Sequence, residues 1–153
     1  MLGVLLSTFP IFQFFGSPLL GALSDRYGRK KLLLISLIGT SIGYVIFGIG
    51  ILTKNVYLLF SSRALDGFTG GNISIALSSI ADVSDEKSKA KNFGLIGMAF
   101  GIGLIFGPYI GGKLSDNSLV SWFDFATPLW FAALLSFVNI LLLLWKYEDT
   151  LIN

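Results

Sequence analysis

The sequence contains no cysteine and no histidine among its 153 residues. Disulfide frameworks, thiol redox chemistry and zinc sites built on these two ligands are therefore excluded for this chain, and we expect neither a metal nor a cofactor. Charged residues are also scarce at 13%, whereas hydrophobic residues make up 54% and the mean hydropathy is +0.77. A soluble domain of this size is far more polar. The composition therefore indicates a membrane protein.

Long apolar runs fill most of the chain. Each is close to the roughly 20 residues that cross a hydrocarbon core about 30 Å thick, so each predicts a membrane-spanning helix. The predicted helices cover residues 2–24, 32–53, 56–81, 93–112 and 126–145. The third contains the only charged residues within these runs, Arg63 and Asp66. The sequence predicts an all-α membrane protein with about five transmembrane helices, because the buried helices of a soluble core are rarely this long and apolar.

Positive charge gathers at one end of the predicted bundle. Eight of the eleven lysine and arginine residues lie in the first and third loops or after the last helix: Arg26, Arg29, Lys30, Lys31, Lys87, Lys89, Lys91 and Lys146. Positive loops stay in the cytoplasm, so we expect this end and the C-terminus to be cytoplasmic. Spans rich in phenylalanine and isoleucine favour a bacterial inner membrane. An external start without a positive flank suggests that a preceding helix is missing.

The stretch GALSDRYGRKK, which begins at Gly21, lies between the first two predicted helices. Glycine at position 28 permits a tight reversal, and Asp25 can pair with Arg29 or with the positive N-terminus of a neighbouring helix. The cations alone would fit a simple topology determinant. The whole pattern resembles the signature loop of the major facilitator superfamily, which joins the second and third helices of that family. The resemblance implies a gating loop that latches two transporter halves, with Gly21, Asp25, Arg26, Gly28 and Arg29 as its members.

Arg63 begins a second motif, in which glycines follow at positions 67 and 70. It resembles the R-x-x-x-G-x-x-G element on the fourth helix of the same superfamily. An arginine inside hydrocarbon is costly unless it faces water or a partner, and Asp66 lies one helical turn away. The two residues are therefore candidates for a transport or proton site. The alternative is a structural ion pair that positions the helix.

A third motif, in the fourth predicted helix, is rich in small residues. Glycines recur there at every fourth position, which leaves a groove for a neighbouring helix, and a proline bends the helix. Generic packing explains the spacing equally well, but the ending GPYIGG resembles the fifth-helix motif of antiporters in the superfamily. The motif consists of Gly97, Gly101, Gly103, Gly107, Pro108, Gly111 and Gly112.

The stretches IADVSD and AKNFG, at residues 80–85 and 90–94, are similar to segments of the tetracycline/proton antiporter group. The resemblance implies that residues 1–153 form a partial major facilitator domain: part of the N-terminal six-helix half of a twelve-helix fold, without its first helix. It also implies proton-coupled efflux of drug-like compounds by alternating access. The chain has Gly43 before Tyr44 where the group has an aspartate. Tetracycline is therefore not assigned as the substrate, and Asp66 is the one acid left deep in the predicted spans.

Other functions fit less well. An enzyme is not expected, because the chain has no metal cluster or phosphate loop and its loop acids lie among lysines. Nucleic-acid binding is not expected of a short basic cluster held at a membrane. The expected partners are the lipid bilayer, a small-molecule substrate and protons. Two alternatives stay open: a truncated, non-autonomous fragment or subunit that needs a missing half or self-association, and a sugar or metabolite transporter of the same superfamily.

Overall fold

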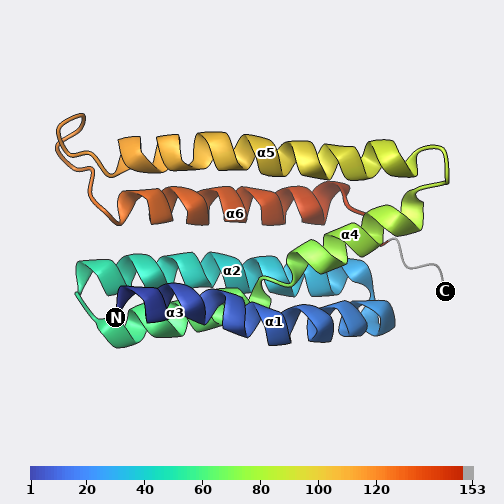
Figure 1. The fold of residues 1–153 in the computed structure, drawn as a ribbon, viewed down its shortest axis with the longest axis horizontal. Coiled ribbons are helices and arrows are strands. Elements are labelled where there is room, and N and C mark those ends of the chain that lie inside the picture. The colour runs from blue at the N-terminus through green and yellow to red at the C-terminus, as the bar shows by residue number, and fades with distance from the viewer. Residues whose placement is uncertain (150–153) are drawn as a thin grey trace.

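The structure, a computed structural model, describes residues 1–149. These residues form helices that run along one long axis and contain no strand, so the all-α prediction is confirmed (Figure 1). The two ends of the described chain lie at opposite ends of the bundle. The helices are α1 (Leu2–Tyr27), α2 (Arg29–Leu52), α3 (Val56–Thr69), α4 (Asn72–Val83), α5 (Lys89–Leu114) and α6 (Thr127–Lys146).

A single residue, Gly28, separates α1 from α2. Its backbone φ is +103°, a conformation that side-chain-bearing residues rarely adopt, and its N–H donates to the Ser24 carbonyl at 3.2 Å. The chain therefore reverses within one residue. The polar stretch expected to form a loop instead extends both helices: α1 continues to Tyr27 and α2 already begins at Arg29.

The span expected as one helix over residues 56–81 is two helices, α3 and α4, separated at Gly70 and Gly71. Neither, at 14 and 12 residues, is long enough to cross a bilayer alone, but they follow one another along the bundle (Figure 1). A Cβ atom on Gly71 would lie only 3.0 Å from the Ser17 Cα atom of α1. The expectation was wrong because hydropathy is continuous through this region, whereas the break accompanies close packing against α1.

Side chains of the neighbouring helices compensate the backbone groups at this break. The Gln13 amide of α1 donates to the Gly70 carbonyl at 3.1 Å, and the Ser36 hydroxyl of α2 donates to the Thr69 carbonyl. Irregular backbone at membrane depth is tolerated when protein groups satisfy it in this way. The break is thus an integral part of the packing among α1, α2 and α3.

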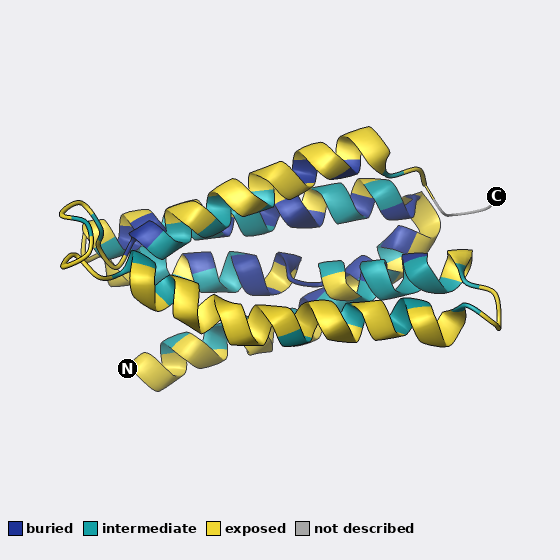
Figure 2. Cartoon of the chain, turned by 90° about the horizontal axis from the view of Figure 1, so that it is seen from above, coloured by how far each residue is buried: buried dark blue, intermediate teal, exposed yellow. Residues whose placement is uncertain are grey.

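The best-packed part of the molecule is formed by α1, α2 and α3, and α6 packs on the other side of α2. A cluster of Leu20, Leu32 and Ile75 joins α1, α2 and α4, and Ile75 is fully buried. In contrast, α5 packs sparsely, mainly against α4 and α6, and contains no buried residue. Figure 2 shows α5 in yellow and teal along its length.

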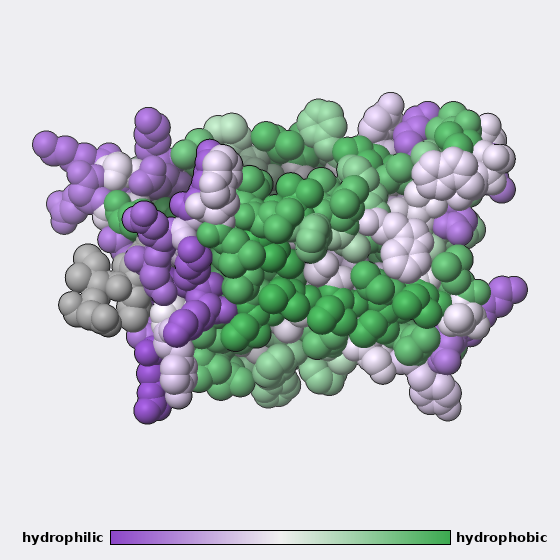
Figure 3. Space-filling model, turned by 180° about the vertical axis from the view of Figure 1, so that it is seen from behind, coloured by the Kyte–Doolittle hydropathy of each residue, from purple (hydrophilic) through white to green (hydrophobic). Residues whose placement is uncertain are grey.

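The surface has the polarity of a membrane-spanning bundle. Apolar side chains form a broad green band around the middle, and hydrophilic residues collect at the two ends (Figure 3). Within residues 1–149, α1, α2, α5 and α6 are each long and apolar enough to cross a bilayer. The more hydrophilic end, on the left in Figure 3, carries the α1–α2 turn, the α4–α5 loop and the end of the described chain.

Candidate functional site

Arg29, at the first position of α2, is the centre of a charged cluster at this end of the bundle. Its side chain forms an ion pair with Asp25 of α1 at 2.6 Å and a hydrogen-bonded ion pair with Asp82 of α4 at 2.9 Å. It also donates to the Ser24 hydroxyl at 3.1 Å. Only 7% of Arg29 is exposed, so these contacts hold a buried cation. We call Ser24, Asp25, Arg29 and Asp82 the Arg29 cluster; it ties three helices together.

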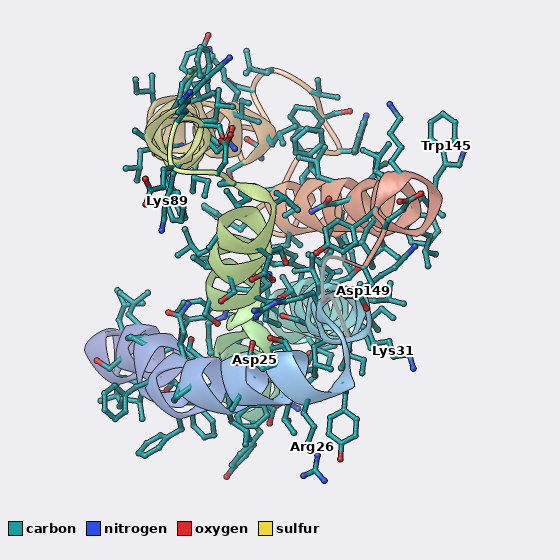
Figure 4. The ribbon with its side chains drawn as sticks, turned by 90° about the vertical axis from the view of Figure 1, so that its right-hand side faces the viewer. Asp25, Arg26, Lys31, Lys89, Trp145 and Asp149 are labelled. Atoms are coloured by element: carbon teal, nitrogen blue, oxygen red, sulfur yellow. The ribbon has the colours of Figure 1, made fainter. Side chains whose placement is uncertain are left out.

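The segment after α6 packs onto the same place. The Arg29 backbone N–H donates to the Asp149 carboxylate at 3.0 Å, and a carboxylate at the N-terminus of a helix is stabilised by the helix dipole. A Cβ atom on Gly28 would lie 2.5 Å from the Asp149 Oδ2 atom, so the carboxylate sits where only glycine leaves room. Nearby, the Tyr147 hydroxyl and Ser79 of α4 hydrogen-bond at 2.7 Å. Figure 4 looks onto this end and shows Asp149 beside the start of α2.

The structure brings most of the expected gating residues together. The predicted pairing of Asp25 with Arg29 is confirmed, and Gly21 faces the Ser74 hydroxyl of α4, 3.7 Å from a Cβ atom placed on it. Arg26 is the exception, because it points away from the bundle and lies over the Tyr27 ring (Figure 4).

Two acidic residues that contact Arg29 were not predicted from the sequence. Asp82 lies 53 residues away and Asp149 lies 120 residues away along the chain. No spacing rule connects residues so far apart. The available signal was only chemical: both acids follow predicted spans that end on the same side of the membrane as Arg29.

Arg63 and Asp66 form a second site, inside the bundle. The Arg63 Nη2 atom lies 3.4 Å from the Asp66 Oδ2 atom, and the guanidinium lies 4.3 Å from the centre of the Phe47 ring of α2. Only 5% of the Asp66 side chain and 18% of the Arg63 side chain is exposed. The Nε and Nη2 atoms of Arg63 are buried and make no hydrogen bond within the described chain. The expected ion pair is present, but the arginine retains donors for a further partner.

Asp66 is packed against α2. A Cβ atom on Gly43 would lie 3.0 Å from the Asp66 Cβ atom, which means that α2 approaches the aspartate as closely as glycine allows. The polar neighbours on α2 are Thr40 and Tyr44. A carboxyl group so enclosed can bind and release a proton only if water or a polar side chain reaches it.

Two acids outside the spans are held in their charged form. The Ser88 hydroxyl and backbone N–H, the latter at 3.0 Å, hydrogen-bond the Asp85 carboxylate and lower its pKa. Ser118 does the same at the opposite end, and its hydroxyl 2.6 Å from Asp116 lowers the pKa of that carboxyl. Both acids therefore stay ionised near neutral pH, which makes them poor proton carriers.

The glycine motif of α5 lies apart from both charged sites. No described atom comes within 4 Å of a Cβ placed on any of its six glycines. The expected groove is therefore open: Gly103, Gly107 and Gly111 line a gap that side chains of α6 border but do not fill.

An apolar helical bundle with an ion pair at membrane depth and a charged cluster at one end is a multi-pass membrane protein. The model of the Major Facilitator Superfamily matches residues 1–151, and the chain therefore belongs to the major facilitator superfamily. This is a family of transporters, not of enzymes. The resemblance found in the sequence motifs is confirmed.

Individual relatives agree with this assignment. The tetracycline resistance protein of class C from Escherichia coli is 40% identical over 140 residues, which cover 92% of this chain and 33% of that protein. The class B protein of the same organism is 38% identical over 148 residues, or 97% of this chain and 35% of that protein. The crystal structure of the human organic anion transporter MFSD10 (TETRAN) superposes with a TM-score of 0.83 and 27% identity, over 97% of this chain and 32% of that one. The chain spans about a third of the length of the relatives it matches.

Proposed function

We propose that this chain forms part of a transporter that exports a drug-like small molecule in exchange for protons, by alternating access. The supporting observation is the Arg63–Asp66 pair, which places a carboxylate and a cation 3.4 Å apart and away from solvent. Ionisable residues at this depth are costly in a membrane and mark ion or substrate pathways. The similarity to tetracycline resistance proteins favours a drug-like substrate.

In this mechanism Asp66 carries the coupling proton. Arg63 stabilises the ionised carboxylate, whereas burial favours the protonated form, so small changes around the pair shift the balance between them. Substrate binds while Asp66 is ionised, held by the donors of Arg63 that the pair leaves unused. Arrival of a proton neutralises Asp66, breaks the pair and displaces the substrate, and loss of the proton restores the binding state.

The gate is proposed at the charged end. Asp25 and Arg29 hold α1 and α2 to α4 when the Arg29 cluster is closed, Gly21 and Gly28 allow the close approach, and Arg26 remains on the surface. The excess of lysine and arginine at this end supports its placement on the cytoplasmic side of a bacterial inner membrane. The open glycine face of α5 is proposed to receive a further transporter helix.

Transport by membrane vesicles tests the proposal. The 153-residue chain would be expressed in bacteria, and accumulation of a drug panel that includes tetracycline would be measured in everted vesicles with an imposed proton gradient. We expect proton-driven accumulation that Asp66→Asn and Arg63→Ala reduce by at least about tenfold, because each removes an interaction made deep in the membrane.

Asp116→Asn is the matched control, because it removes an equal charge from an exposed turn. Proton-dependent transport that Asp66→Asn leaves unchanged would show that Asp66 is not the coupling acid. No transport by inserted chain would favour the alternative of a part that works only with further helices or a second copy.

A second candidate substrate class has its own support. The buried Nε and Nη2 donors of Arg63, unused within the described residues, suit an anionic group, and the structural relative is an organic anion transporter. Anionic dyes in the same vesicle panel would distinguish this class from neutral and cationic drugs.

A further inference from the structure

A crevice lined by both apolar and polar side chains lies between α2 and α6, away from the gate. Its volume is about 320 Å³, and the lining contains both hydroxyl and amide groups. Thr40 and Tyr44 contribute from α2, and Ser136 and Asn139 contribute from α6. Asn139 is seven residues from the end of α6, or about 10 Å along the helix, and therefore lies within the hydrocarbon layer.

The crevice adjoins Asp66 through two side chains of α2. Thr40 and Tyr44 line the crevice and are also the polar neighbours of the Asp66 carboxyl group. The Thr40 hydroxyl further reaches Thr69 of α3, with 3.5 Å between the two oxygens. The side chains of Thr40 and Tyr44 therefore lie between the crevice and the Asp66 carboxyl group.

Next to Asp66, Gly67 packs against α1. Among the described residues, Arg63 on its own helix and Tyr44 on α2 are the charged or titratable groups that act on it. The α1 side chain packed against the adjacent Gly67 belongs to Phe12, which is apolar. Polar access to the carboxyl group is thus available from the α2 side.

Polar groups in the crevice need a polar occupant. Asn139 is exposed on α6 and makes no hydrogen bond within residues 1–149, although an amide left unsatisfied in hydrocarbon costs on the order of several kcal/mol. Ser136 donates only one long bond, 3.4 Å, to the Leu37 carbonyl. Water satisfies such groups, and the volume is large enough for several molecules.

We propose that the crevice between α2 and α6 is filled with water and delivers protons to Asp66 past Thr40 and Tyr44. A hydronium ion in the crevice passes its proton along hydrogen-bonded water and hydroxyl groups to a carboxylate oxygen of Asp66. The products are water and the neutral carboxylic acid, and the reverse transfer releases the proton. The inference rests on the proposed role of Asp66 and adds the path and its positioning residues.

Thiol labelling tests whether the crevice holds water. The chain has no native cysteine, so single variants Asn139→Cys and Leu141→Cys carry one reactive group each. Leu141 is also exposed, at 50%, but it lies two residues further on and so about 200° around the helix from Asn139. In phosphatidylcholine vesicles, we expect a permanently charged methanethiosulfonate reagent to label Asn139→Cys at least about tenfold faster, because thiol labelling follows access to water. Equal, slow labelling would overturn the proposal.

Infrared spectroscopy tests the connection to Asp66. At a pH low enough to protonate it, the carboxyl band of Asp66, identified by its loss in Asp66→Asn, shifts when the vesicles are moved into D₂O. Filling the crevice with Ser136→Leu should slow this shift by about tenfold, since the proton path loses its water. Leu141→Phe, which adds bulk on the opposite face, should not slow it.

Asn139→Leu provides a milder test if Ser136→Leu fails to fold. An unchanged shift in both filled variants would overturn the proposal. The outcome is separable from the proposed function: if Asp66→Asn abolishes proton coupling but filling changes nothing, only the path is wrong. If Asp66→Asn leaves coupling intact, the proposed function itself fails, whatever the labelling shows.

Discussion

The helices α3 and α5 both carry glycines, but they use them in opposite ways. On α3, the position of a Cβ atom at Gly67 is taken by the Phe9 carbonyl and the Phe12 side chain of α1. On α5, no described atom lies within 4 Å of a Cβ atom placed on Gly97 or Gly101. One region is closed by backbone contact, and in the other no described atom closes on the glycines.

This difference shows that glycine spacing alone does not define a helix contact. Small residues permit close approach in membranes, where packing rather than the hydrophobic effect drives helices together. Whether the approach takes place depends on a facing helix. Three substitutions test this contrast. Gly67→Ala and Arg29→Ala act in the tightly packed part of the bundle, and Gly101→Ala acts on α5.

The largest effect is expected for Gly67→Ala. The added methyl group would overlap the Phe9 carbonyl and lie 3.1 Å from the Phe12 Cβ atom, so α1 must move away from α3. We expect the free energy of unfolding to fall by about 2–3 kcal/mol, as for overpacked cores. Unfolding of the chain in mixed micelles, followed by circular dichroism during titration with sodium dodecyl sulfate, measures this loss. A loss below about 0.5 kcal/mol would show that the α1–α3 contact is not tight in the membrane protein.

An intermediate effect is expected for Arg29→Ala. The substitution leaves Asp82 without its partner at 2.9 Å and releases Asp25, but the 62% exposure of the Asp25 side chain limits the penalty. The same titration should show a loss of about 1–2 kcal/mol, less than for a fully buried pair. Arg29→Lys should recover only part of it, because an ammonium group does not span both carboxylates. Lys31→Ala, an exposed cation two residues away, is the control; an equal loss there would contradict a specific role for Arg29.

The smallest effect is expected for Gly101→Ala in the open region. No described atom opposes the methyl group, and alanine favours the helix over glycine, so stability should rise by about 0.5 kcal/mol. A loss of more than about 1 kcal/mol that depends on chain concentration would instead show that a second copy covers α5. Measuring the same titration at two protein-to-detergent ratios distinguishes these results.

Much of the fold follows from the sequence because membrane-spanning helices are governed by local properties. Apolar length predicts α1, α2, α5 and α6, and the place of Asp25 at a helix end beside cations predicts its pairing with Arg29. The reversal at Gly28 was likewise expected from glycine's freedom at positive φ. Each of these features depends on residues close together in the chain.

The features that escaped prediction depend on contacts between distant segments. The break at Gly70 and Gly71 is accompanied by close packing against α1, and the Asp149 contact with the α1–α2 turn joins residues 120 positions apart. The crevice beside Asp66 has one signal in the sequence. Asn139 lies within a largely apolar run, where an amide is costly in lipid and favours a polar neighbour or water.

The break between α3 and α4 is a point about which α4 could tilt relative to α3. Asp82 lies eleven residues beyond Gly71, or about 17 Å along α4, so a rotation of about 10° at the break would displace it by about 3 Å. The ion pair with Arg29 is 2.9 Å long, so that displacement is enough to separate the two charges. Asp66 lies on the other side of the break, about one helical turn before Gly70, so the same tilt would displace it far less. A slight tilt at this break would therefore move both Asp66 and Asp82, and it would move Asp82 much further.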